Sequence, residues 1–347
     1  MGQSISFFDP NAVNPYVLKW NVGVQRELPG HMVLEVVYIG NHAVHLPINT
    51  QIDYIPRQFL TTSVFRDSAL NSTLTGNVPN PFQGLLPNST SLNGSTINRQ
   101  NLLVPFPQYG VNGVTLQDNP AGSSYYHSLN VRLQKRFTNG LVLLNNFSWS
   151  SMIERLSYLN DSDFAPEKRV SGDSRPLAET LAATYDLPVG RNRTFDLHSR
   201  LGNTLVGGWK LNGILSLRSG PVLGTFGNVI YMGGPLNFNP EQPNRPSFDL
   251  SQFVQPSGSQ PVFNIRTFGS EFGNLRRDAS KNLDLSASKD FPFGERRYVQ
   301  LRIETFNITN HVTFAAPNLS PTSSAFGTIA SQANSPRYIQ LGARVVW

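Results

Sequence analysis

The sequence predicts an all-β protein, and within that class a transmembrane antiparallel up-and-down β-barrel. Nine segments alternate apolar and polar residues with the period of two that strands show. The links between them alternate between short and long, as in transmembrane barrels. The chain also ends inside such an alternation, on Trp347, whereas soluble domains usually end in polar, frayed residues.

The composition agrees with a protein of strands and turns. Of the 347 residues, 39% are hydrophobic and 14% are charged, while 28 glycines and 25 prolines favour turns over helices. The absence of cysteine excludes disulfides and thiolate metal sites. The formal net charge is +6, but the basic residues are scattered and do not alternate with stacking aromatics. We therefore expect no nucleic-acid partner.

The first four segments form two predicted hairpins. In residues 16–28 one parity is apolar apart from Arg26, and it consists of Leu18, Trp20, Val22, Val24 and Leu28. A Pro-Gly turn at 29–30 leads to residues 31–40, whose apolar parity is Met32, Leu34, Val36 and Tyr38. The second hairpin joins residues 127–137 to residues 141–150 through the turn at 138–140. Its apolar parity is Leu129, Val131, Leu133, Phe137, Leu141, Leu143, Phe147 and Trp149.

Five further segments repeat the pattern, at residues 176–187, 208–220, 281–291, 296–307 and 336–347. The predicted links are short at 29–31, 138–140 and 292–296, intermediate at 188–208, and long at 42–124, 152–176, 220–280 and 309–336. Loops this long are unusual inside a compact domain. Short turns at one end and long loops at the other are typical of barrels in outer membranes.

The two parities predict two environments. In a membrane barrel the apolar parity faces lipid and the polar parity faces a wet lumen, whereas a soluble sandwich turns its apolar face inward. Bulky charged and amide side chains on the polar parity favour the barrel. So do aromatics at strand ends, where membrane interfaces lie: Trp20, Phe137, Trp149, Trp209, Phe291 and Trp347. We expect the tryptophans on the lipid side at two levels, Trp20 and Trp149 near the loops, Trp209 and Trp347 near the turns.

Catalytic motifs are absent from the sequence, which has no GxSxG, HExxH, GxGxxG or P-loop pattern. His42 and His45 could bind a metal, and Asp161, Asp163 and Glu167 could hold a hard cation. Both groups fit solvated loop residues better. We therefore expect no metal, no cofactor and no enzyme activity.

Five stretches carry a resemblance to a known family: "NPYVLKWNVGVQRELPG", "SSYYHSLNVRLQKRFTNGLVLLNNFSWS", "GGWKLNGILSLRSG", "FGNLRRDASKNLDLSASKDFPFGERRYVQLRIETFNITNH" and "FGTIASQANSPRYIQLGARVVW". In this order they resemble the C-terminal part of Oar-like TonB-dependent receptors. The resemblance implies an outer-membrane barrel of about 22 strands with an N-terminal plug, a TonB box and a signal peptide. Residues 1–347 would be the C-terminal barrel portion of about nine strands, with those N-terminal parts absent, as in a truncated gene.

The resemblance also implies function and partners. Such receptors bind a ligand with their outer loops and import it with force from the TonB system, which would act through the missing N-terminal part. The lipid of the outer membrane would surround the wall, and the barrel-assembly machinery would read the last strand, which makes Trp347 an assembly residue. The ligand stays open among siderophores, vitamins, glycans and peptides. The alternative is a secreted or cell-surface β-rich binding or structural module.

Polar residues of the inward parity are the candidates for contact with a passing ligand. They are Lys19, Gln25, Arg132, Gln134, Arg218, Arg302, Glu304 and Arg344. The competing interpretation is that they solvate the lumen and pair with one another or with the plug.

Overall fold

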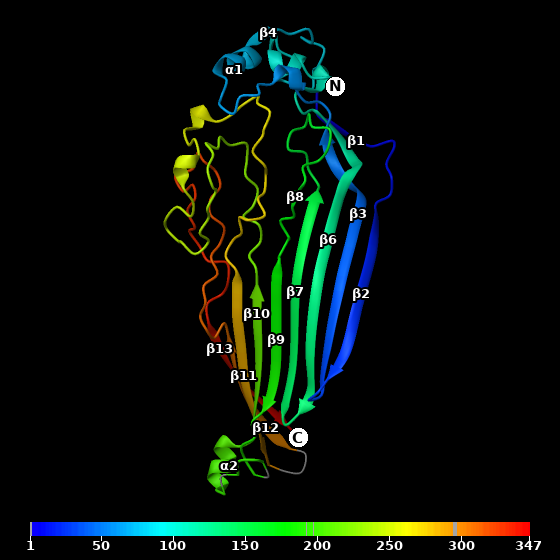
Figure 1. The fold of residues 1–347 in the computed structure, drawn as a ribbon. Coiled ribbons are helices and arrows are strands. Elements are labelled where there is room, and N and C mark those ends of the chain that lie inside the picture. Colours follow the sequence, from blue (N-terminus) through cyan, green and yellow to red (C-terminus); the bar gives the residue numbers. More distant parts are fainter. Residues whose placement is uncertain (1, 192, 197, 294–296) are drawn as a thin grey trace.

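A computed structural model describes residues 2–191, 193–196, 198–293 and 297–347. Its main feature is one curved sheet whose principal strands are ordered β13-β12-β11-β10-β9-β7-β6-β3-β2 (Figure 1). These strands are β2 (Tyr16–Leu28), β3 (Met32–Gln51), β6 (Val114–Thr138), β7 (Leu141–Arg155), β9 (Leu177–Asp186), β10 (Trp209–Arg218), β11 (Ser280–Pro292), β12 (Tyr298–Phe306) and β13 (Tyr338–Val346). All nine predicted segments are therefore strands, joined as neighbours in sequence order, and the all-β partial-barrel prediction is confirmed.

The remaining elements are short. β1 (Ile5–Phe8) pairs in parallel with β6, β8 (Arg169–Val170) pairs with β7, and β4 (Asn77–Pro79) pairs with β5 (Thr96–Asn98). The helices are α1 (Ser68–Thr75), α2 (Arg200–Val206), η1 (Arg57–Phe59), η2 (Arg99–Leu102), η3 (Pro107–Tyr109), η4 (Leu250–Gln252) and η5 (Ser257–Ser259). No helix in the described part of the chain is long and apolar enough to cross a membrane.

The two ends of the sheet differ as the link lengths predict. The short turns, α2 and the C-terminus lie at one end, and the N-terminus, α1, β4 and the long loops lie at the other (Figure 1). Residues 294–296 of one predicted short turn lie outside the described residues. We call residues 52–113, 156–176, 219–279 and 307–337 the loop cap.

Two strands run much further than their sequence pattern predicts. β3 continues to Gln51 and β6 begins at Val114, so parts of the predicted 42–124 loop are paired strands, as at Ile48 opposite Asn119. Register shifts after Val44, Leu46 and Ile48 break the period of two. The backbone is also irregular here, since His45 has a φ of 56°. Side chains therefore do not alternate regularly between the two faces, and the sequence lacks the pattern by which a strand is recognised.

The apolar parity forms one exposed face of the sheet, which we call the apolar face. Val22, Val24 and Leu341 on it are 68%, 71% and 76% exposed, respectively. The other sheet of the described residues, β4-β5, lies in the loop cap (Figure 1), so these residues do not form two packed sheets with their apolar faces inward. The polar residues Asn145 and Glu179 on this face satisfy each other through a hydrogen bond of 2.8 Å from Asn145 Nδ2 to Glu179 Oε1.

The tryptophans sort into the two predicted levels and do not share a core. Trp20 pairs opposite Gly40 and Trp149 opposite Leu129, both toward the loop cap. Trp209 begins β10 at the turn end, and Trp347 follows β13 and is 89% exposed. Lys289, an exception on the apolar face, lies 6.0 Å from the Trp209 ring centroid and donates to Gly207 O at the end of α2.

The buried hydrophobic clusters lie in the loop cap and not under the sheet. The larger one contains Leu223, Phe226, Val229, Phe248, Phe253, Leu275 and Phe326, and the smaller one contains Leu86, Leu92 and Ile97. Phe326 packs edge-to-face on Phe248 and Phe253, with ring centroids 5.2 Å and 5.3 Å away. The long loops therefore fold around cores of their own.

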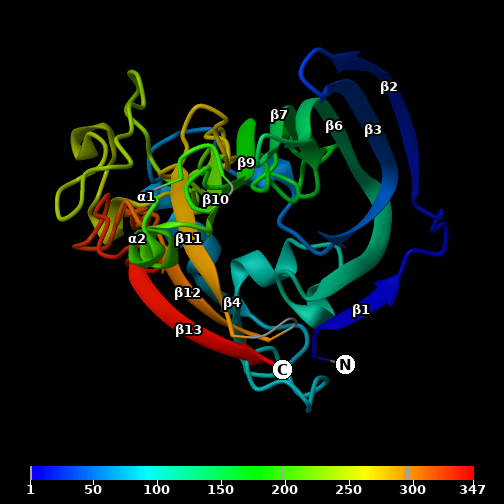
Figure 2. The same ribbon diagram turned by 90° about the horizontal axis from the view of Figure 1, so that it is seen from below.

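The sheet is open within the described residues. Figure 2, seen along the strands, shows it bent into a wall, with β13 and β2 at its two edges. Every pair along the nine-strand path is antiparallel, so β2 and β13 run in the same direction. An antiparallel pair between them is therefore impossible.

The contact between Trp20 and Gly40 generates a stability prediction. A β-carbon at Gly40 would lie 2.3 Å from Cε2 of Trp20, so Gly40→Ala must displace the indole ring. We expect it to lower the free energy of unfolding from lipid by about 1–3 kcal/mol. Gly342→Ala is the matched control, because its nearest neighbour would be Arg302 Cβ at 4.0 Å. Equal losses at both glycines would show that the indole does not require the space.

Candidate functional site

The polar parity forms a continuous hydrophilic face, which we call the polar face. Strand register aligns one row across seven strands: Gln25, Glu35, Arg132, Asn146, Thr180, Ser216 and Asn282. A second row contains Thr184, Asn212, Ser286, Glu304 and Gln340. Within it, Thr184 Oγ1 donates to Asn212 Oδ1 at 2.9 Å, and Asn212 Nδ2 donates to Ser286 Oγ at 3.2 Å. A wet surface therefore extends over most of the wall.

The eight sequence-predicted ligand candidates all lie on the polar face, but the structure does not gather them at one point. Arg132 forms an ion pair of 3.9 Å with Glu35, opposite Gln25, and Arg302 forms one of 3.5 Å with Glu304. These contacts fit the interpretation that lumen residues pair with one another. The others are spread over four strands: Lys19 opposite Asn41, Gln134 opposite Leu144, Arg218 opposite Ala178, and Arg344 opposite Gln300. Their role in ligand contact stays a prediction.

A cluster of arginines at the loop end of β10 was not predicted. Arg175 and Arg277 come from the loop cap and Arg218 from the end of β10. The charges of Arg218 and Arg277 both act on the Arg175 guanidinium. Burial lowers the pKa of Arg175, Asp173 opposes that change, and the charges of Arg218 and Arg277 add to it. Four guanidinium groups, with Arg276 included, make the potential at this end of the polar face positive, and the carboxylate of Asp173 opposes part of that charge.

Backbone contacts fix the fourth arginine. Arg276 Nη1 donates to Ser174 O at 2.8 Å and to Gly220 O at 3.3 Å. Burial, and then the charge of Arg175, lower the pKa of Arg276. The cluster was missed because Arg175 lies about a hundred residues before Arg276 in the sequence, and only the pairing of β9, β10 and β11 brings their loops together. A neighbouring cavity of about 470 Å³ is lined by Arg218, Asn282, Asp284 and Asn334.

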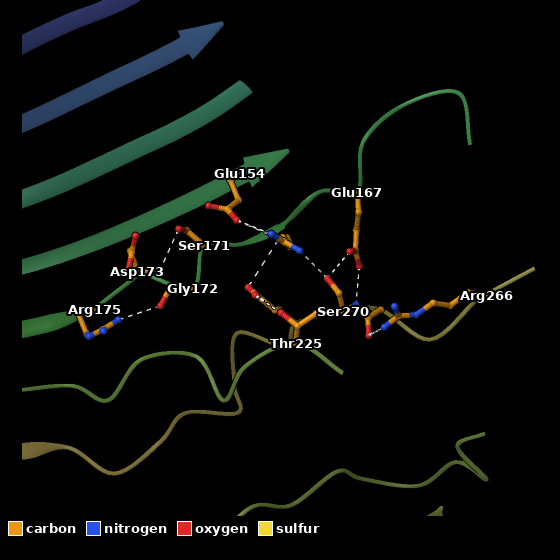
Figure 3. Close-up of polar contacts among 12 residues, drawn as sticks. Glu154, Glu167, Ser171, Gly172, Asp173, Arg175, Thr225, Arg266 and Ser270 are labelled. Atoms are coloured by element: carbon orange, nitrogen blue, oxygen red, sulfur yellow. Dashed lines mark hydrogen bonds and ion pairs between the residues drawn. The ribbon is translucent and has the colours of Figure 1, made fainter. Parts of the chain in front are cut away.

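A polar network ties the loops of the cap together (Figure 3). Arg169 on β8 donates through Nε and Nη2 to Glu154 Oε1 at 3.1 Å and 3.0 Å, and through Nη1 to Ser270 Oγ at 3.2 Å. Its Nε also lies 3.9 Å from Glu271 Oε2. Because Glu154 and Glu271 are largely buried, this guanidinium supplies the positive charge that both carboxylates need, through hydrogen bonds to Glu154 and through an ion pair with Glu271, whose Oε2 has no hydrogen-bond partner.

A second part of the network joins the same two loops. Glu167 accepts hydrogen bonds from Ser270 N at 2.9 Å and from Ser270 Oγ at 2.5 Å. Arg266 Nε donates to Phe268 O at 2.8 Å and its Nη2 to Phe226 O at 2.5 Å. Burial lowers the pKa of Arg266, and the charge of Glu167 opposes that change. The polar network thus anchors residues 156–176 to the phenylalanine-rich core of residues 219–279.

The residues that the sequence offers as possible metal ligands make other contacts in the structure. His42 stacks on Tyr125 at 3.8 Å and His45 contacts Tyr16 at 5.7 Å between ring centroids. Asp163 accepts from Arg57 at 3.2 Å, while burial and then repulsion from Asp163 raise the pKa of Asp161. Among the residues that the structure describes, no group of three or more His, Cys, Asp or Glu could hold a metal ion.

Comparison with known proteins identifies one matching family and one solved structure with limited similarity. A family model described as "Outer membrane beta barrel domain" matches residues 1–340. No curated protein matches the sequence. Among solved structures, the outer membrane transporter YddB from Escherichia coli is similar, with 11% identity and a TM-score of 0.47. The match covers 99% of this chain and 34% of the transporter, so the chain spans about a third of that structure's length.

The polar network predicts a large, localised effect of removing its central cation. Arg169→Met leaves Glu154 buried without its partner, so we expect a loss of about 3–5 kcal/mol in the stability of the loop cap. Hydrogen exchange should accelerate in residues 156–176 and 219–279, with the strands unchanged. Arg57→Met is the control, since its pair with Asp163 is half exposed and contributes about 1 kcal/mol or less. Similar exchange in both variants would remove the network's assigned role.

Proposed function

This chain belongs to the outer membrane beta barrel domain family, and from that premise we propose that it is the C-terminal barrel portion of a TonB-dependent receptor. The outer membrane is its location, and the apolar face contacts lipid. The proposal assigns residues 1–347 to wall and outer loops. The plug, the TonB box and the signal peptide would belong to an N-terminal part, through which the TonB system acts.

One observation carries the proposal: a continuous polar face lies beneath a folded loop cap, with an arginine cluster where the two meet. An uptake receptor needs loops that capture a ligand and a hydrophilic wall along which it passes. The same-direction edges of β2 and β13 support the assignment to a larger barrel, since further strands are required to close an antiparallel wall. A secreted module is disfavoured, because family membership implies a membrane that covers the apolar face.

The proposed roles of the residues follow from their positions. The eight polar-face candidates line the passage, and no residue is assigned a catalytic role. The imported ligand is unidentified. We propose that the barrel-assembly machinery recognises the last strand through Trp347.

The test of this function compares uptake in cells with and without TonB. Deleting the gene should reduce accumulation of one class of nutrient in TonB-containing cells, and should change nothing in cells that lack TonB. Siderophores, vitamins, glycans and peptides form the panel. Equal accumulation of every compound with and without the gene would contradict the import function.

Face-specific substitution tests the membrane assignment of the wall. Leu341→Arg places a charge on the apolar face, so we expect it to cost about 2–4 kcal/mol near the bilayer midplane. Gln340→Arg, its neighbour on the polar face, should be nearly neutral because it meets water. Unfolding from lipid vesicles measures both. Equal costs would show that the two parities do not face different solvents.

Deletion of Trp347 tests the assembly role. One exposed terminal residue adds little to strand pairing, so refolding yield in detergent should stay unchanged. The amount of folded barrel in the outer membrane of cells should fall. If cellular levels match those of the intact chain, Trp347 is an interface anchor without an assembly role.

A further inference from the structure

A pocket opens on the apolar face at its loop end, away from the polar face. Its volume is about 460 Å³, and its lining includes Tyr125, His127, Ser151, Ile153, Arg155 and Lys168. Strand register explains the location: Tyr125 pairs opposite Ile153 and His127 opposite Ser151, so these side chains share the apolar parity of β6 and β7. A pocket with charged and hydroxyl side chains on the lipid-facing side of a barrel is not explained by ligand import.

The pocket lies at the level of the membrane interface. Strands need about 9–11 residues to cross a bilayer, and counting from Leu141 on β7 this places Ser151 at the loop-side boundary. Aromatic residues mark the same level: Trp20 lies 6.2 Å and Tyr38 6.1 Å from the His127 ring, between centroids. Tyr38 Oη and His127 Nδ1 are also hydrogen-bonded at 2.8 Å. The lining therefore meets headgroups rather than acyl chains.

The charges at the pocket are complementary to an anion. Arg155 and Lys168 supply two cations, and Arg155 uses Nη1 to donate to Pro166 O at 3.2 Å. Glu154 is the acidic residue of the lining, but its carboxylate is neutralised by Arg169 at 3.0 Å. Ser123 and Ser151 add hydroxyl groups of the kind that bind phosphate or sugar oxygens. A pocket of this size, with two cations and two hydroxyl groups in its lining, fits a phosphorylated sugar headgroup.

We propose that this pocket binds the phosphate-bearing headgroup of a glycolipid in the outer leaflet of the outer membrane. Arg155 and Lys168 pair with the phosphate, the serines bind the sugar, and the aromatic residues below contact the start of the acyl chains. The site is independent of the proposed import function, because none of the eight polar-face candidates lines it.

Tryptophan fluorescence tests the site, since Trp20 contacts the His127 ring of the pocket. The detergent-solubilised chain is titrated with bisphosphorylated lipid A, with its phosphate-free form, and with sodium phosphate. We expect saturable binding of the phosphorylated lipid alone. The double variant Arg155→Gln/Lys168→Gln should bind it about thirtyfold more weakly, because it removes two surface cations.

Matched variants separate the site from general effects of charge or folding. Lys19→Gln/Arg344→Gln removes the same charge from the polar face and should leave lipid binding unchanged. Arg155→Lys keeps the charge and should stay within about threefold of the wild-type affinity. Equal affinity for the phosphorylated and phosphate-free lipids, or equal weakening by both double variants, would overturn the proposal. Saturation by sodium phosphate alone would also overturn it, by assigning the pocket to a free anion.

Discussion

Backbone pairing in the absence of water is the constraint on which this structure depends. A strand that faces lipid has no solvent for its N–H and C=O groups, so each strand of the wall must pair with a neighbour on both sides. The strict antiparallel order from β2 to β13 meets this need inside the sheet. Because lipid then covers the apolar side chains, the wall requires no protein core beneath it. The buried clusters consequently lie in the loop cap.

The sequence predicts the wall well because lipid and lumen impose a simple alternation on each strand. The apolar parity of residues 336–347 reappears as Ile339, Leu341, Ala343 and Val345 in β13. Prediction fails where the alternation is interrupted. The long ends of β3 and β6 contain register shifts at Val44 and Leu46, so their sequence has no period of two although they are paired.

The loop cap could not be predicted, for a different physical reason. Phe226, Phe253 and Phe326 lie far apart in segments rich in proline, glycine and asparagine, and no local period connects them. Their contacts depend on loops that enter the cap from different strands. The same holds for the arginine cluster and for the contact between Arg169 and Glu271, which join segments about a hundred residues apart. The spacing of the alternating segments predicts long loops, but it does not predict that these loops are folded.

The separation of wall from cap has an evolutionary consequence. On the apolar face, Val24 or Leu341 contacts fluid acyl chains, where one aliphatic residue can replace another with little change in fit. Phe326, by contrast, is 2% exposed between two other rings, where close packing penalises any change of shape. Neutral drift should therefore exchange aliphatic residues freely along the strands and spare the aromatic centre of the loops. Loops that share such a centre would diverge as a unit, so change in the loop cap would arise by replacement of whole loops more readily than by single substitutions.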